Sequence, residues 1–133
     1  MKSNKKVFLG GTCNESTWRK EIIKKLEIDY FNPVVEDWTP ECQEEEIKQR
    51  KRCDFVLYCI TPKMTGSYSI AEVVDDSNKR PSKTLYVQLN SDDDCSFSDA
   101  QIRSLKAVKK MISLNGALCF DTLEDVAKFL NKQ

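Results

Sequence analysis

Residues 53 to 72 read CDFVLYCITPKMTGSYSIAE, an apolar run followed by a loop with proline and glycine and then by a helix start that carries a carboxylate. The part from Asp54 to Ile60 is the most continuously apolar segment of the chain, which is typical of a central strand buried on both faces of a parallel sheet. Open α/β sheets bind their ligands outside the carboxyl ends of the strands. We therefore take Glu72, on the helix that follows this strand, as the candidate chemical centre.

Strands and helices alternate along the rest of the chain. The expected strands are 5–9, 29–35, 54–60, 84–89 and 117–120. The expected helices are 14–26, 39–52, 69–77, 98–115 and 121–130. Residues 90–96 include three consecutive aspartates and are expected to form a solvated loop.

The alternation predicts an α/β fold in which helices cover both faces of a parallel sheet. We expect one domain over residues 1–133, a flavodoxin-like three-layer sandwich with a five-stranded parallel sheet of order 2-1-3-4-5, because right-handed crossovers leave few alternatives. In that order strands 1 and 3 are neighbours at the switch point of the sheet. The loops after them, 10–12 and 61–69, would therefore share one crevice.

Composition excludes several classes of function. Basic and acidic residues both number 21, so there is no excess positive charge to predict a nucleic-acid partner. The apolar runs are too short for a membrane span and no secretory signal is recognisable, so we expect a cytoplasmic location. The six cysteines form no C-x-x-C pair and are expected to be free thiols. The chain has no histidine, which excludes Ser-His-Asp and Cys-His catalysis and His-ligated zinc.

Two interpretations of Glu72 are open at this point. Glu72 follows Ser69 by three residues, the spacing of a capping box in which the two side chains close the start of a helix. Alternatively, the helix N-terminus holds Glu72 as an ionised carboxylate at the mouth of the crevice, where it acts as a nucleophile. Gly10-Gly11 lacks the spacing of a dinucleotide or nucleoside-triphosphate loop.

Several segments together resemble the nucleoside 2-deoxyribosyltransferases and their short relatives. They are VFLGGT, Trp18-Arg19, FNPVVEDW, and Glu46 eight residues before DFVLY with S-x-x-E beyond it. The resemblance covers roughly residues 5 to 90 and implies a flavodoxin-like homo-oligomer, a dimer or higher, that acts on a small-molecule nucleoside or nucleotide. No cofactor or metal ion is expected.

By this resemblance, Glu72 attacks the anomeric carbon of a deoxynucleoside and Glu46 holds or protonates the leaving base. Asp37 and Trp38 would line the base pocket, Gly10, Gly11 and Thr12 would form the floor under the sugar, and Ser69 would contact the substrate. Each has a plain structural alternative: a solvated helix face for Glu46, a surface turn for Asp37 and Trp38, and a tight turn for the glycines.

The chain also departs from the pattern of these enzymes. Gly66 stands where a second carboxylate is common, Val73 where glycine often follows the nucleophile, and Phe8 where a tyrosine often orients it; Tyr68 is a candidate to replace that hydroxyl. A second hypothesis is therefore a non-catalytic sensor of a nucleotide-derived ligand, or a TIR-like interaction module.

Overall fold

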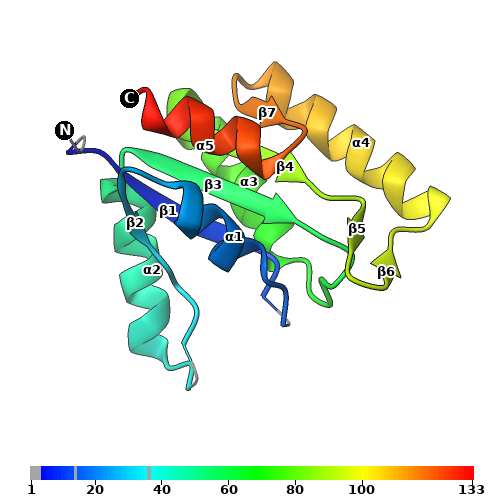
Figure 1. The fold of residues 1–133 in the computed structure, drawn as a ribbon, viewed down its shortest axis with the longest axis horizontal. Helices are drawn as coiled ribbons and strands as arrows, with labels where there is room; N and C mark the ends of the chain where they lie inside the picture. The colour runs from blue at the N-terminus through cyan, green and yellow to red at the C-terminus, as the bar shows by residue number, and fades with distance from the viewer. Residues whose placement is uncertain (1–3, 14, 36) are drawn as a thin grey trace.

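The computed structural model describes residues 4–13, 15–35 and 37–133. The described residues form a five-stranded parallel sheet of order β2-β1-β3-β4-β7 (Figure 1). Its strands are β1 (Lys6–Gly11), β2 (Asp29–Phe31), β3 (Phe55–Ile60), β4 (Thr84–Gln88) and β7 (Leu118–Phe120). The predicted order 2-1-3-4-5 is confirmed, with β7 as the fifth strand of the sheet.

Helices cover both faces of the sheet. They are α1 (Trp18–Lys25), α2 (Pro40–Arg52), α3 (Tyr68–Lys79), α4 (Asp99–Leu114) and α5 (Leu123–Asn131), with a short 3₁₀ helix, η1 (Pro81–Lys83), before β4. The side chains of α1 and α5 share one hydrophobic core, whereas those of α3 and α4 belong to a second core on the opposite face. The predicted three-layer arrangement is confirmed.

The alternation of side chains along β3 explains why this strand is apolar throughout. Leu57 and Cys59 pack in the core under α1 and α5, and Val56, Tyr58 and Ile60 pack in the core under α3 and α4. Successive residues of a strand point to opposite faces, so a strand covered on both sides needs apolar residues at every position.

Two local predictions are wrong. The second strand ends at Phe31 and not at Val35, because Pro33 has no N–H with which to extend the ladder. The segment 90–96 is not a simple loop but contains a hairpin of two antiparallel strands, β5 (Ser91–Asp92) and β6 (Cys95–Ser96). Its turn places Asp93 at φ 54, a left-handed conformation that aspartate tolerates.

Helix starts were predicted with mixed success. Thr39, Ser98 and Thr122 each cap a helix through their side chains, as their sequence context predicts. The predicted start of the first helix, Asn14, lies outside the described residues, as does Glu36 of the FNPVVEDW motif, and α1 begins at Trp18. Within the described ranges, no helix combines the length and apolarity that a membrane crossing requires.

Candidate active site

A cleft of about 400 Å³ opens at the carboxyl end of β1, beside β3, where the order of the sheet places a ligand site. This volume is within the range of small-molecule sites. Its walls come from segments far apart in the sequence, because β1, α1, the segment before α2, α2 and α3 all reach this edge. The residues that line the cleft include Phe8, Gly10, Gly11, Arg19, Trp38, Glu46, Tyr68, Ser69 and Glu72.

Gly10 and Gly11 form the cleft wall with backbone atoms because there is no room for side chains. A Cβ at Gly10 would lie 2.6 Å from the ring of Tyr58, and one at Gly11 would lie 2.1 Å from the carbonyl oxygen of Cys59. Gly11 also has φ +114, in the region that favours glycine. The tight β1–β3 approach therefore requires both glycines, whatever substrate the exposed backbone contacts.

Thr12 does not line this cleft. Its side chain is buried and its Oγ1 accepts a hydrogen bond of 2.9 Å from the Thr61 amide, which joins the ends of β1 and β3. Thr12 instead borders a smaller adjoining cavity of about 160 Å³, together with Gly66. Of the three residues expected to form the floor under the sugar, Gly10 and Gly11 line this cleft and Thr12 does not.

Glu72 lies in the cleft with 9% of its surface exposed. Burial, assisted by the nearby charges of Glu46 and Asp76, raises the pKa of its carboxyl to about 7, although Arg50 opposes the shift. The N-cap residue of α3 is Ser67 and not Ser69, so Glu72 is the fifth residue of the helix. The Ser67 side chain makes no capping hydrogen bond. The capping-box interpretation is therefore wrong, and Glu72 lies beyond the first turn of the helix.

Glu46 faces the same cleft from α2. Burial raises the pKa of its carboxyl, while Arg50 and Arg19 act in the opposite direction. The structure therefore brings together two carboxyl groups from different helices, both with raised pKa values. Such pairs are found where one acid donates a proton and the other acts as a nucleophile or base.

Aromatic side chains border the cleft on two sides. Trp38, 57% exposed, lies on the segment before α2, and Tyr68 opens α3. Ser69 also lines the cleft, whereas Asp37 is exposed and does not. Trp18 is a core residue, and its indole donates a hydrogen bond of 2.7 Å to the Thr12 carbonyl.

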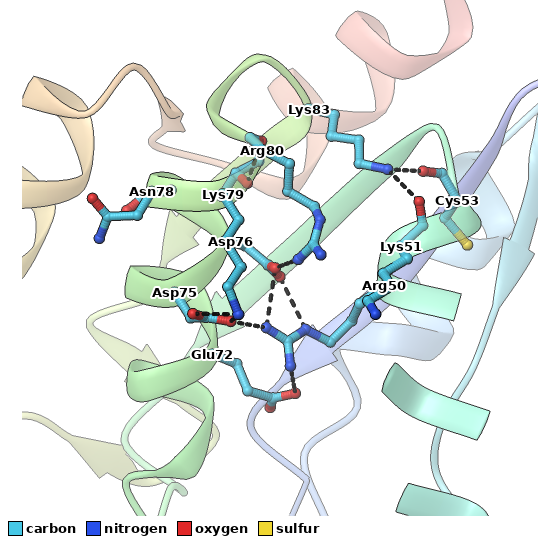
Figure 2. Close-up of polar contacts among 12 residues, drawn as sticks. Arg50, Lys51, Cys53, Glu72, Asp75, Asp76, Asn78, Lys79, Arg80 and Lys83 are labelled. Atoms are coloured by element: carbon cyan, nitrogen blue, oxygen red, sulfur yellow. Dashed lines mark hydrogen bonds and ion pairs between the residues drawn. The ribbon is translucent and has the colours of Figure 1, made fainter. Parts of the chain in front are cut away.

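Two buried arginines were missed by the sequence analysis as site residues. Arg19 donates hydrogen bonds to the backbone carbonyls of Leu9, Gly11 and Thr12, and so fixes the end of β1 at the cleft. Burial lowers the pKa of its guanidinium. Arg50 lies between α2 and α3, and Figure 2 shows its guanidinium facing Glu72 and two aspartates of α3.

A spacing of four residues could have revealed the second arginine. Glu46 and Arg50 are four apart on α2, and Glu72 and Asp76 are four apart on α3, so each pair lies on one helix face. Two helices that each carry such a pair can bring the four side chains together. Within the described residues, no group of three or more acidic or cysteine side chains is arranged to hold a metal ion.

Comparison with known proteins agrees with this geometry. A scan against protein-family models matches residues 4–87 to the family described as nucleoside 2-deoxyribosyltransferase like. No curated protein matches the chain. The matched segment extends from just before β1 into β4 and includes both cleft carboxylates, Glu46 and Glu72. Since the match covers more than half of the chain, the protein belongs to the nucleoside 2-deoxyribosyltransferase-like family.

Proposed function

We propose that the protein cleaves the N-glycosidic bond of a deoxynucleoside or nucleotide, with Glu72 as the nucleophile. The observation that carries this proposal is the burial of Glu72 in a cleft at the carboxyl end of β1, with Glu46 on the same cleft. Membership of the family supports a glycosyl-transferring activity of this class. The acceptor is either a second base, which gives transfer, or water, which gives hydrolysis.

The proposed reaction has two displacement steps. A carboxylate oxygen of Glu72 attacks the anomeric carbon, the bond to the base nitrogen breaks, and its electron pair leaves with the base, which takes a proton from Glu46. The deoxyribosyl group is then esterified to Glu72 until a base or water attacks the same carbon, loses its proton to Glu46 and releases the Glu72 carboxylate. Retaining glycosidases divide their reaction between two carboxyl groups in the same way.

The surroundings of the two acids suit these roles. A carboxyl with a pKa of about 7 is partly ionised at neutral pH, so Glu72 can attack. Burial also raises the pKa of Glu46, which favours the form that can give a proton to the departing base. The indole of Trp38 offers a surface on which a base can stack. In this proposal Ser69 and the backbone of Gly10 and Gly11, which line the cleft, contact the sugar.

The test is incubation with deoxynucleosides and deoxynucleotides, with and without a free acceptor base, followed by chromatography. We expect base release in both cases and a new nucleoside when the acceptor is present. Transfer without release in water would identify a transferase, and release alone a hydrolase. If no base is released from any substrate while the same compounds raise the melting temperature, the enzyme proposal fails.

That outcome would support the second candidate, a non-catalytic sensor. The observation in its favour is Gly66, which stands where the resemblance expects a second carboxylate and which borders the smaller cavity and not the cleft. A TIR-like module has no comparable support. The cytoplasmic location that the apolar pattern predicts is also part of this proposal. From the resemblance we further propose a homo-oligomer, which would cover the exposed side chains of Tyr30, Val34 and Val35 at and beyond the edge strand β2.

The pH dependence of base release is expected to follow Glu72. The rate should rise as pH increases through about 7, because only the ionised carboxylate attacks. In Glu46→Gln the overall rate should fall, and the rise should move to lower pH, since the charge of Glu46 contributes to the raised pKa of Glu72. Measurement of kcat/KM from pH 5 to 9 for both proteins checks this, and a flat wild-type profile would contradict it.

A further inference from the structure

A buried ion network adjoins Glu72 among residues that do not line the cleft, and its centre is Asp76. The Asp76 side chain is fully buried. Its Oδ1 contacts Nη1 of Arg80 (Figure 2). Its Oδ2 accepts a hydrogen bond of 2.5 Å from the Tyr58 hydroxyl. A carboxylate held by two elements in this way has little freedom to rotate.

Asp76 in turn fixes Arg50. Nε and Nη2 of Arg50 donate to the two oxygens of Asp76 at 3.1 and 3.0 Å, a bidentate contact, and Nη2 also lies 3.0 Å from Asp75. Because a guanidinium is planar, this contact sets the direction of the remaining nitrogen. Nη1 lies 3.7 Å from Oε2 of Glu72, the contact drawn at the bottom of the network in Figure 2.

That distance matters for chemistry. At 3.7 Å the positive charge stabilises the Glu72 carboxylate, but the separation is too long for a hydrogen bond that would occupy a lone pair of the oxygen. The oxygen therefore stays free to form a bond to substrate. A lysine at position 50 could not hold this arrangement, since an ammonium is a point charge without a second planar nitrogen pair.

The other ionisable groups around Glu72 favour its protonated form or act from farther away. Glu46 on α2, in its ionised form, and Asp76 on the same helix as Glu72 raise the pKa of Glu72, and Asp75, which contacts Arg50, is a further acidic neighbour. Tyr58 on β3 is neutral because burial raises its pKa, and Arg19 on α1 has a smaller effect than Arg50. Arg50 is therefore the main group that opposes burial.

We propose that Arg50 is a positioning residue, fixed by Asp76 and Tyr58, that favours the ionised form of Glu72 and leaves its oxygens free to react. This inference deepens the proposed function and rests on it only for the claim that Glu72 reacts with a substrate. The ion network itself can be tested without a substrate, because its immediate effect is on the ionisation of Glu72.

The experiment is a ¹³C NMR titration of the glutamate side-chain carboxyls, with the Glu72 signal assigned from its loss in Glu72→Gln. We expect Arg50→Gln to raise the pKa of Glu72 by about one pH unit or more. The matched control is Lys79→Gln, which removes the same charge from an exposed position where solvent screens it, and should leave the pKa unchanged. The pH profile of base release should move in parallel.

Two further variants protect the test against misfolding. Arg50→Lys keeps the charge but loses the bidentate contact, and Tyr58→Phe frees Asp76 without changing any charge; each should raise the pKa of Glu72 less than Arg50→Gln. An unchanged pKa in every folded variant at position 50 would overturn the inference. If the pKa rises but no base is released by the wild type, the proposed function fails and the positioning role stands.

Discussion

Replacing Glu72 with glutamine is expected to reduce base release from a deoxynucleoside by about 10³-fold or more, with the fold intact. Glutamine has the size of glutamate but no anionic oxygen with which to form the ester, so both displacement steps are lost. The cleft, Trp38 and Glu46 remain, and substrate binding should therefore survive.

The same substitution is expected to preserve or increase stability above neutral pH. Because the folded protein raises the pKa of Glu72 to about 7, the contribution of this carboxyl to stability is complete below its unfolded pKa and is lost as pH rises through about 7. At pH 8 the wild type therefore carries the cost of a buried carboxylate, which glutamine avoids. Groups that serve chemistry often have such a cost.

Chromatographic assay of base release and thermal melting at pH 8 check both expectations. Glu44→Gln, an exposed acid of α2 outside the cleft, is the matched control and should behave as the wild type does. Mass spectrometry of acid-quenched enzyme should detect a deoxyribosyl adduct in the wild type that is missing in Glu72→Gln. Near wild-type turnover by Glu72→Gln would refute the nucleophile assignment.

Gly11→Ala is expected to destabilise the protein by about 3 kcal/mol or more. The added Cβ would lie 2.1 Å from the Cys59 carbonyl oxygen and 2.7 Å from the Cys59 amide nitrogen, and the residue has φ +114. Both clashing atoms belong to the backbone of the central strand β3, so neither can rotate away. The strands would have to separate, which would also widen the cleft.

Gly66→Ala is the matched control for this prediction. A Cβ at Gly66 would have no atom within 4 Å, so the change in the free energy of unfolding should stay within about 0.5 kcal/mol. Urea denaturation of the two variants and the wild type gives the comparison. Equal stability of the two variants would contradict the close approach of β1 and β3.

The architecture could be predicted because its signals are local. The apolar run at Asp54 to Ile60 indicates a buried central strand, and the caps at Ser98 and Thr122 indicate helix starts. The β5–β6 hairpin could not be predicted, because its sequence is polar and its position depends on distant contacts. Asp92 accepts hydrogen bonds from Ser16 at 2.6 Å and Thr61 at 2.7 Å, side chains that follow β1 and β3.

The sequence predicted part of the lining of the cleft, but not the charged residues that surround it. Glu72, Glu46, Trp38 and Ser69 lie there with the two glycines, as the resemblance implies, whereas Asp37 does not. Arg50 was missed because a charged residue in a polar helix is usually solvated, whereas this one is buried where it pairs with acidic side chains of α3. Such tertiary burial leaves no mark in the local sequence pattern.

The pairing of β1 with β3 also determines when the site can form as the chain folds. The first contact of this pair, from the Lys6 amide to the Asp54 carboxylate, joins residues 48 positions apart. Contacts of such separation require the closure of a long loop, and parallel sheets therefore fold slowly relative to helical proteins. Gly10 and Gly11 lie on β1 and α3 follows β3, so these two parts of the cleft come together when the strands pair. We therefore expect the ability to bind substrate to appear no earlier than the central sheet during refolding.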